Sequence, residues 1–280
     1  MAQSKPNLFR IAQTNAASLE EQLKEVQANM DPQAAQKLAD FLSWFLAEAR
    51  ISINLPAAVL ATFSRGGVYL NIHAWASEQE TLSGRGAVEC LRERLGTYFD
   101  RRLAFDTAFE NGEKFVYAAV NAGGPGLSSR FDTFCVVLAP NGSCSPETAA
   151  YLPGDSLDCC FDESGAFSLE LVSRMICPHP HCHCLAAVKL GQRATLTPRQ
   201  SWPSVVLSDT DYIEVVLASA PGFNEVAEIR VHRRIYDDLW NLAFANFARK
   251  LSDAEKALVL DFTYLVAESR EGKFRLEVVS

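Results

Sequence analysis

The sequence lacks the features that mark proteins bound to nucleic acids or membranes. Its 280 residues include 26 lysines and arginines against 34 aspartates and glutamates, a formal net charge of −8, and no basic run exceeds two residues. Proteins that neutralise phosphates carry a basic stripe. No segment offers the roughly 18 consecutive apolar residues of a membrane span, and the N-terminus lacks the apolar stretch of a secretory signal. We therefore expect neither nucleic acid nor a membrane as the main partner.

The chain does contain ample apolar material for a packed interior. Hydrophobic residues make up 48% of the sequence and charged residues 21%, which excludes disorder of the whole chain. The eight cysteines are the unusual feature. Disulfide scaffolds suit small secreted domains that cannot build a core, so we expect these thiols to be reduced.

Cysteine and histidine are concentrated in residues 177–184, where three of each occur in eight positions. Thiolate and imidazole are the ligands that zinc prefers. The spacing is not the paired Cys-x-x-Cys of common zinc modules, and on a strand Cys182 and Cys184 would point to one side while His183 points to the other. Packing of this segment is the favoured interpretation, zinc is the alternative, and we assign no metal ligand.

The patterning divides the chain into four segments. Asp31 and Pro32 have the residue types of an N-cap and a first helical position, and apolar residues at helical spacing follow them. The predicted segments are a flexible leader or frayed terminus over 1–18, a helical module over 19–55, a β core over 56–232 and C-terminal helices over 233–280.

Short β-prone runs separated by Gly, Pro, Asn and Ser clusters dominate the predicted core. One helix, about 83–100, interrupts them. The chain ends with two helices over 234–269, separated by a break at 251–253. Strands with helices gathered at the ends indicate an α+β fold. The predicted strands are 57–63, 67–74, 114–120, 133–138, 167–172, 185–190, 204–207 and 212–217.

Glu214 is the first candidate for chemistry, because it lies within an otherwise apolar strand. Alternation places Tyr212, Glu214 and Val216 on one face of that strand. A carboxylate in this setting must be solvated, paired or catalytic, since burying it unpaired costs several kcal/mol. The alternative is an edge-strand glutamate that faces water.

Two further segments carry polar side chains in suggestive patterns. In the predicted strand 67–74, Tyr69, Asn71 and His73 share a face that suits hydrogen bonding to a ligand, although a lone strand histidine is more often simply satisfied. The glycines at 123, 124 and 126 allow close approach of a ligand, but no Walker lysine follows them. A β-hairpin connection is the alternative for this loop.

Taken together, these motifs resemble, in order and spacing, those of a bacterial protein family. Its pattern comprises a strand ending in Asn-Phe-His, a Gln-Phe-Glu-Thr segment, a Tyr-Gly-Ala-Leu-Asn strand, an Arg-Phe-Gly strand, a Gly-Asp-Ser turn and a Tyr-Ile-Glu strand. The arrangement is similar to the ADP-ribosyltransferase fold, a split β-sandwich whose motifs surround NAD. The matching segments here are 69–73, 96–99 with 105–107, 117–121 with 129–132, 154–156 and 211–214.

The resemblance implies a role for each matching residue. Glu214 would stabilise the oxocarbenium-like transition state formed when nicotinamide leaves ribose, by bonding the ribose 2′-hydroxyl. The other implied NAD contacts are His73 or Arg65 on the dinucleotide, Tyr98 or Phe99 stacked on nicotinamide, Arg130 on phosphate as a bidentate donor, and Asn121.

The resemblance also bears on the acceptor of ADP-ribose. Arginine-modifying transferases commonly carry an acidic residue two positions before the catalytic glutamate, and here that position is Tyr212. A hydroxyl acceptor is therefore favoured over arginine, with Asp106 as the base that takes its proton. The predicted activity is mono-ADP-ribosylation of a threonine or serine, with host ubiquitin as one candidate acceptor. An NAD glycohydrolase and a zinc-stabilised interaction module are the alternatives.

The predicted location follows from the same features. A polar leader without a cleavable signal fits a bacterial effector delivered into a host cell, and it equally fits an enzyme of the bacterial cytoplasm.

Overall fold

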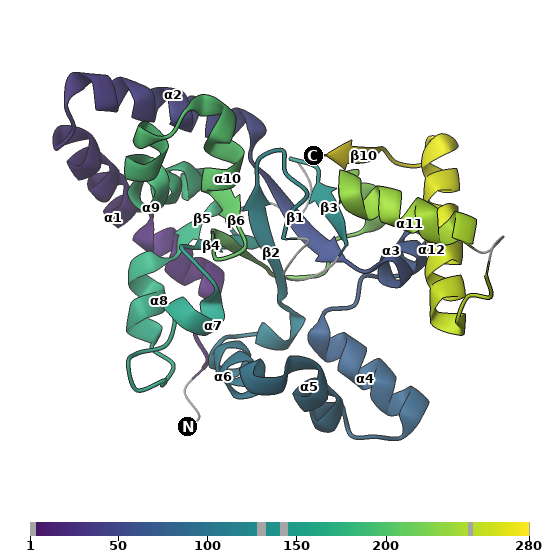
Figure 1. Ribbon diagram of the computed structural model, residues 1–280. Coiled ribbons are helices and arrows are strands. Elements are labelled where there is room, and N and C mark those ends of the chain that lie inside the picture. Colours follow the sequence, from purple (N-terminus) through teal and green to yellow (C-terminus); the bar gives the residue numbers. More distant parts are fainter. Residues whose placement is uncertain (1–3, 128–132, 141–144, 246–248, 280) are drawn as a thin grey trace.

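An eight-stranded sheet forms the centre of the molecule (Figure 1). The computed structural model describes residues 4–127, 133–140, 145–245 and 249–279. The strand order is β10-β9-β3-β1-β2-β8-β4-β5, in which only β10 and β9 pair in parallel. A separate ribbon consists of β6 (Leu207–Ser208) and β7 (Asp211–Tyr212). The strands of the sheet are β1 Arg50–Leu55, β2 Val116–Asn121, β3 Phe134–Leu138, β4 Ala149–Leu152, β5 Cys177–Pro178, β8 Glu214–Leu217, β9 Val226–His232 and β10 Leu276–Val279.

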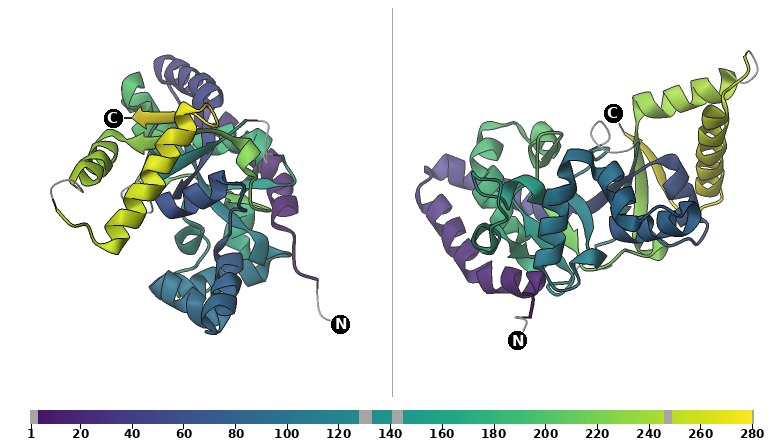
Figure 2. Two further views of the ribbon diagram at one scale, coloured as in Figure 1. Left: turned by 90° about the vertical axis from the view of Figure 1, so that its right-hand side faces the viewer. Right: turned by 90° about the horizontal axis from the view of Figure 1, so that it is seen from below.

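Helices surround this sheet in three groups (Figures 1 and 2). The first group, α1, α2, α9 and α10, lies towards the β5 end, while α3, α11 and α12 lie towards the β10 end, and α4, α5 and α6 form an arm beside the sheet. The short helices α7 and α8 precede β5. The bounds are α1 Leu8–Ala28, α2 Pro32–Glu48, α3 Ala57–Ser64, α4 Ile72–Ser83, α5 Ala87–Leu95, α6 Phe99–Ala108, α7 Ser156–Cys159, α8 Leu169–Met175, α9 Cys182–Leu196, α10 Trp202–Val206, α11 Arg233–Ala245 and α12 Asp253–Arg270.

The two faces of the sheet differ in what covers them. Ile51, Val120 and Val215 point into the main hydrophobic core, which α2, α3, α9 and α12 complete. On the other face, a smaller core of α1, α6 and α8 covers the β4 end only. We call the first the closed face and the second the open face. Across β1 and β2, the open face is therefore left free to line a cavity.

The α+β class predicted from the sequence is confirmed, with more helix than expected. The strands predicted at 114–120, 133–138 and 212–217 are present as β2, β3 and β7 with β8. The N-cap at Asp31 is confirmed, since its side chain accepts from the backbone N–H groups of Gln33 and Ala34. The two C-terminal helices are present as α11 and α12, with the predicted break between them.

Several predicted strands are helices instead. The segment 57–63 forms α3, 167–172 overlaps α8, 185–190 lies within α9, and 204–207 spans the end of α10. Segment 67–74 is a loop followed by the start of α4, and the single helix predicted at 83–100 is divided between α5 and α6. Short apolar runs suit a buried helix as well as a buried strand, so the pattern alone could not separate the two.

The predicted segment boundaries also need correction. The leader is helical from Leu8, and Leu8 and Phe9 are buried against α6 and α8 residues, so it is not a flexible tail. Residues 50–55, assigned to the helical module, form the central strand β1. The C-terminal segment ends in β10, which joins the sheet beside β9.

The glycine-rich loop does not close a β-hairpin, because β1 lies between β2 and β3 and pairs with both. Its backbone is instead fixed to the open face. Asn54 Oδ1 accepts from the Leu127 N–H at 2.9 Å, and Asn121 Nδ2 donates to the Gly124 carbonyl at 2.9 Å. Gly126 has φ +71°, and a Cβ there would lie 2.2 Å from Asn54 Oδ1. Only glycine fits this position.

Candidate functional site

A cavity of about 470 Å³ lies on the open face beside Glu214. The strand registers place Ser52, Ala119 and Glu214 opposite one another across β1, β2 and β8. Polar and aromatic side chains from the arm and from the turn before α7 close its other walls. The lining residues are Ser52, Ile53, Asn54, Tyr69, Leu95, Tyr98, Arg102, Tyr117, Ala118, Ala119, Leu127, Asp155, Leu157, Tyr212 and Glu214. The volume is within the usual range for small-molecule sites, roughly 300–1,000 Å³.

Glu214 is a buried carboxylate, with 4% of its surface exposed. Its Oε2 accepts a hydrogen bond from the Ser156 N–H at 2.9 Å. Burial raises the pKa of Glu214 to about 7, and Asp155 adds to the rise, while Arg102 and the Ser156 N–H act in the opposite direction. A titratable group poised near neutrality in a cavity is a typical mark of a functional site.

Arg102 on α6 is the cation that acts on Glu214. Its guanidinium lies 3.4 Å from the centre of the Tyr117 ring and donates to Ser156 Oγ at 3.3 Å. Burial disfavours its charge, but Tyr117, Glu214 and Asp106 together raise the pKa of Arg102 above its ordinary value. The guanidinium is therefore a fixed positive charge against the cavity wall.

Asp106 lies behind this wall and does not line the cavity. It is 2% exposed, its Oδ2 is 2.6 Å from His73 Nε2, and its Oδ1 accepts from the Tyr117 hydroxyl. Arg102 NH1 is 3.9 Å from the same Oδ1. Burial raises the pKa of Tyr117 well above its ordinary value, so its hydroxyl stays protonated and donates a hydrogen bond to Asp106.

The turn 154–156 and the strand before Glu214 are held together. Asp155 caps α7 by accepting from the Leu157 N–H at 3.0 Å, and its other oxygen accepts from the Tyr212 hydroxyl at 3.0 Å. Lys189 of α9 donates to the Tyr212 carbonyl at 2.6 Å. Asp155 lines the cavity as its second carboxylate, beside Glu214.

Ser52 contributes a buried hydroxyl to the cavity lining. It is 2% exposed, and among the described residues its Oγ makes no hydrogen bond of normal geometry. The Cys135 thiol, whose pKa the Ser52 hydroxyl lowers against the larger effect of burial, is only a weak hydrogen-bonding group. A buried polar atom left in this state favours a bound ligand or water.

The structure brings together part of the predicted site. Glu214 and Tyr98 line the cavity, whereas His73 lies on α4 and contacts Asp106 from outside it. Phe99 is buried in the core of the arm, beneath Arg92. Asn121 is buried and holds the glycine-rich loop, away from the lining.

Of the two predicted arginines, the described Arg65 lies away from the cavity. Arg65 ends α3 and lies over the Tyr264 ring at 4.0 Å and 3.8 Å from Asp261 of α12. It therefore belongs to the contact between α3 and the C-terminal helices. Arg130 lies outside the described residues.

Sequence reasoning missed Ser52, Asn54 and Arg102 as site residues. Ser52 and Asn54 alternate with Ile51, Ile53 and Leu55, a strand pattern that was hidden inside the predicted helical module. Arg102 follows another arginine in a charged segment, and nothing in the local pattern marks it for burial.

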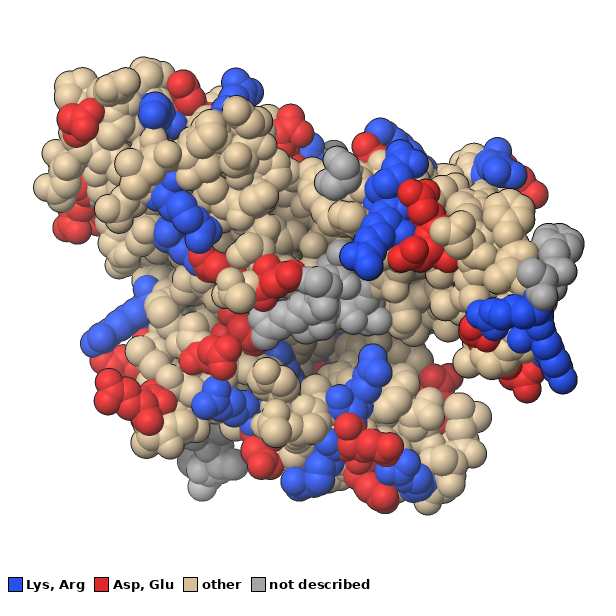
Figure 3. Space-filling model, viewed as in Figure 1, with Lys and Arg blue, Asp and Glu red and all other residues tan. Residues whose placement is uncertain are grey.

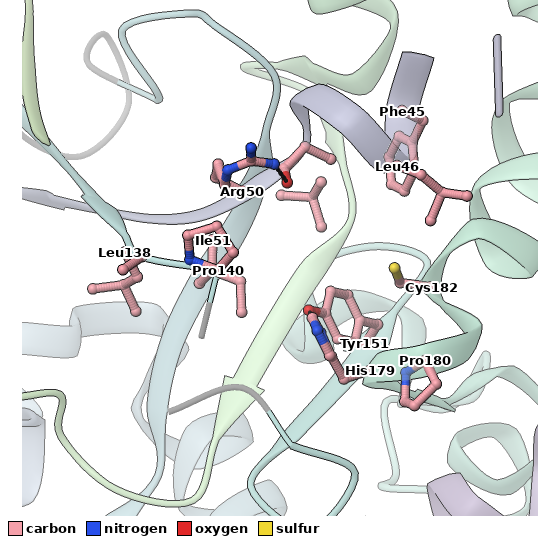
Figure 4. A pocket seen from close by; sticks show the side chains of 13 residues that line it. Phe45, Leu46, Arg50, Ile51, Leu138, Pro140, Tyr151, His179, Pro180 and Cys182 are labelled. Carbon is pink, nitrogen blue, oxygen red and sulfur yellow. Dashed lines mark hydrogen bonds between the residues drawn. The ribbon is translucent and has the colours of Figure 1, made fainter. Parts of the chain in front are cut away.

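A second cavity of about 210 Å³ lies on the closed face (Figure 4). It is mostly apolar, and the Tyr151 hydroxyl lies 2.6 Å from His179 Nδ1 at one side of it. Burial lowers the pKa of His179. No described residue of its lining carries a carboxylate, so this cavity is the weaker candidate for catalysis.

The Cys–His segment 177–184 forms one wall of this second cavity, through His179, Pro180 and Cys182. It is not a strand throughout, since α9 begins at Cys182. Among the described residues, no group of three or more His, Cys, Asp or Glu side chains is placed to hold a metal ion. All seven cysteines that the structure describes are free thiols.

Surface charge and helix composition add two observations. On the face shown in Figure 3, basic and acidic side chains are interspersed, and neither sign forms one continuous area. Within the described ranges, no helix combines the length and apolarity required to cross a membrane.

Comparison with known proteins adds no assignment. No protein-family model matches the sequence, and the search of curated proteins finds no match either.

Proposed function

We propose that the Glu214 cavity binds NAD and that the protein transfers ADP-ribose from NAD to a hydroxyl group of a protein acceptor. The observation that carries the proposal is the Glu214 carboxylate, which is buried on the open face with Arg102 and several tyrosines around the same cavity. The motif order of the sequence, which resembles that of ADP-ribosyltransferases, supports the same assignment.

Glu214 supplies the central chemistry in this proposal. As the bond between nicotinamide and ribose breaks, positive charge develops on the ribose ring. A fixed carboxylate that accepts a hydrogen bond from the 2′-hydroxyl stabilises this charge. Only the ionised form of Glu214 can do so, and Arg102 favours that form. Transfer to a hydroxyl then releases nicotinamide and one proton.

The remaining lining residues suit the two halves of the reaction. Tyr98 is half-exposed at the cavity and offers a ring on which nicotinamide can stack. Asp155 is the second carboxylate of the lining, and Tyr212 already donates to it. We assign the contact with the acceptor hydroxyl to Asp155 instead of Asp106, because Asp106 is buried behind Tyr117.

Labelling with NAD tests the proposal directly. Wild-type protein incubated with biotin-labelled NAD and a eukaryotic lysate, or with ubiquitin as the first purified acceptor, should label a protein at a hydroxyl side chain. Glu214→Gln should abolish labelling. Glu268→Gln on α12 removes another buried carboxylate, which pairs with Lys273, and should retain labelling. Equal labelling by wild type and Glu214→Gln would contradict the proposal.

Binding and product analysis separate the alternatives. NAD at a hundredfold excess over its dissociation constant should stabilise the fold by about 2.7 kcal/mol. Free ADP-ribose formed at full rate without an acceptor would instead assign an NAD glycohydrolase, which uses the same carboxylate and water.

Delivery into a host cell is part of the proposal for a bacterial effector. Leu8 and Phe9 are buried, so deleting residues 1–30 would damage the fold as well as any export signal. Fusing residues 1–30 to a reporter and measuring its secretion avoids this difficulty, and a reporter that stays in the bacterium would count against export.

A further inference from the structure

A row of contacting side chains connects the Glu214 cavity to a surface groove on the arm. His73 opens to this groove, together with the exposed Glu113 and Lys114, whose charges offset each other. Its imidazole bonds Asp106, and Asp106 bonds Tyr117. Arg102 lies over the Tyr117 ring and lines the same cavity as Glu214. His73 is thus the one member of this row, among the described residues, that reaches the groove from outside the cavity.

Two buried carboxylates interact electrostatically with Arg102. Asp106 is 2% exposed and Glu214 is 4% exposed, and Arg102 acts on both. Its contact with Asp106 is long, 3.9 Å from NH1 to Oδ1. Asp106 has a much closer cationic partner available, because His73 Nε2 lies 2.6 Å from Oδ2. A positive charge on the His73 imidazole would therefore offset the Asp106 carboxylate, whereas a neutral imidazole would not.

We propose that His73 influences the charge of Glu214 indirectly, by offsetting the negative charge of Asp106 in the cluster around Arg102. When His73 is protonated, its charge offsets that of Asp106, and Arg102 acts on the Glu214 carboxylate without that opposing charge. When His73 is neutral, the uncompensated negative charge of Asp106 opposes that of Arg102 and disfavours the ionised form of Glu214. His73 is a positioning residue in this scheme, since it contacts neither the cavity nor a ligand in it.

The geometry of the arm makes this coupling rigid. Asn71 caps α4 by accepting from the Ala74 N–H at 2.8 Å, and its amide donates to the Glu113 carbonyl at 2.8 Å. These bonds fix the first turn of α4, which carries His73, against the segment that leads into β2. A fixed pair in a poorly solvated site interacts more strongly than an exposed pair.

The other charged groups around Glu214 do not provide the same coupling. Asp155 disfavours the ionised form of Glu214, and Ser156 favours it through its N–H. Asp155 accepts from the Leu157 N–H and the Tyr212 hydroxyl, on the side of the cavity away from α4. Cys160, which Glu214 also influences, stays a neutral thiol because its hydrogen bond with Cys159 and its burial raise its pKa.

The test measures the ionisation of Glu214 without NAD. In protein labelled with ¹³C at glutamate carboxyls, the Glu214 resonance is identified by its loss in Glu214→Gln and titrated with pH. His73→Gln keeps a side-chain donor for Asp106 but cannot carry the charge, and should raise the apparent pKa of Glu214 by roughly half a unit or more. Asp106→Asn removes the negative charge that opposes Arg102 and should lower the apparent pKa of Glu214.

A matched control separates coupling from general damage. His181→Gln alters a similar pair, with His181 Nε2 3.0 Å from Glu20 Oε1, and should leave the Glu214 titration unchanged. A Glu214 titration within about 0.2 units of wild type in both His73→Gln and Asp106→Asn would overturn the inference. Should one variant fail to fold by circular dichroism, the other decides alone, since the two predict opposite shifts.

The effect of His73 on catalysis rests on the proposed function, whereas its effect on the Glu214 titration does not. If the titrations shift as expected but no NAD is consumed, the proposed function fails and the coupling stands. If NAD is consumed and the titrations do not shift, the coupling fails. With both in place, the pH profile of kcat/KM should move in His73→Gln in the same direction as the Glu214 titration.

Discussion

Replacing Glu214 by glutamine should change the pH dependence of stability in a way that can be worked out from its burial. The pKa of Glu214 is raised to about 7 in the folded protein, from 4.5 in the unfolded chain. The folded state therefore binds more protons than the unfolded state between these values. Stability that is fully present below pH 4.5 is lost as the pH rises through 7.

The size of the effect follows from the same two values. A difference of one pKa unit corresponds to about 1.4 kcal/mol. Integrated from about pH 5 to about pH 8, the ionisation of Glu214 costs the wild type about 2 to 3 kcal/mol of unfolding free energy. Glutamine cannot ionise, and its carbonyl oxygen can still accept from the Ser156 N–H. The unfolding free energy of Glu214→Gln relative to the wild type should therefore increase by this amount between about pH 5 and about pH 8.

Urea unfolding of both proteins at several pH values measures the difference directly, because the midpoint and slope give the free energy at each pH. Glu268→Gln is the control. The pKa of Glu268 is lowered, mainly by its bond from Lys273, so its contribution is lost only as the pH falls and should not grow between pH 5 and 8. A stability difference between Glu214→Gln and wild type that stays constant across this range would refute the argument.

Three further predictions concern the site and its support. If the proposed function holds, kcat/KM for NAD should rise with pH through about 7, because only ionised Glu214 is active; a flat profile from pH 6 to 8 would contradict this. Gly126→Ala should destabilise the fold by about 1–3 kcal/mol, since its Cβ would meet Asn54 Oδ1 at 2.2 Å and Cys135 Sγ at 2.8 Å; unchanged thermal unfolding would show that the loop is not fixed as described. Leu8→Ala should cost about 2–5 kcal/mol because Leu8 is fully buried; an effect below 0.5 kcal/mol in urea unfolding would restore the interpretation of a loose leader.

Local sequence signals were sufficient where a residue type marks one kind of local structure, such as a helix cap. Asp31 followed by Pro32 marked the start of α2, and the break at 251–253 separated α11 from α12, where Ser252 and Glu255 form a capping box. Alternation in 212–217 placed Glu214 and Tyr212 on one face, and both line the same cavity.

Short apolar runs were the main source of error. Segments 57–63 and 185–190 contain the residues of a buried strand, yet they form α3 and part of α9, and both helices contribute buried side chains to the main core. The opposite error hid β1, whose alternating Ile and polar residues followed a helical segment without a clear break. Burial in the whole structure, not local preference, decided these segments.

The amino-acid sequence by itself determined the α+β class, the start of α2, the break between α11 and α12 and the choice of Glu214 as the principal candidate, because these depend on spacing and side-chain type within a few residues. Only the tertiary structure decided what surrounds Glu214. His73 and Asp106 are 33 positions apart, and Arg102 and Ser156 are 54 apart, yet both pairs are in hydrogen-bond contact. Such contacts depend on how the arm packs beside the sheet, and the burial that results sets the charge of each group, which no local pattern can specify.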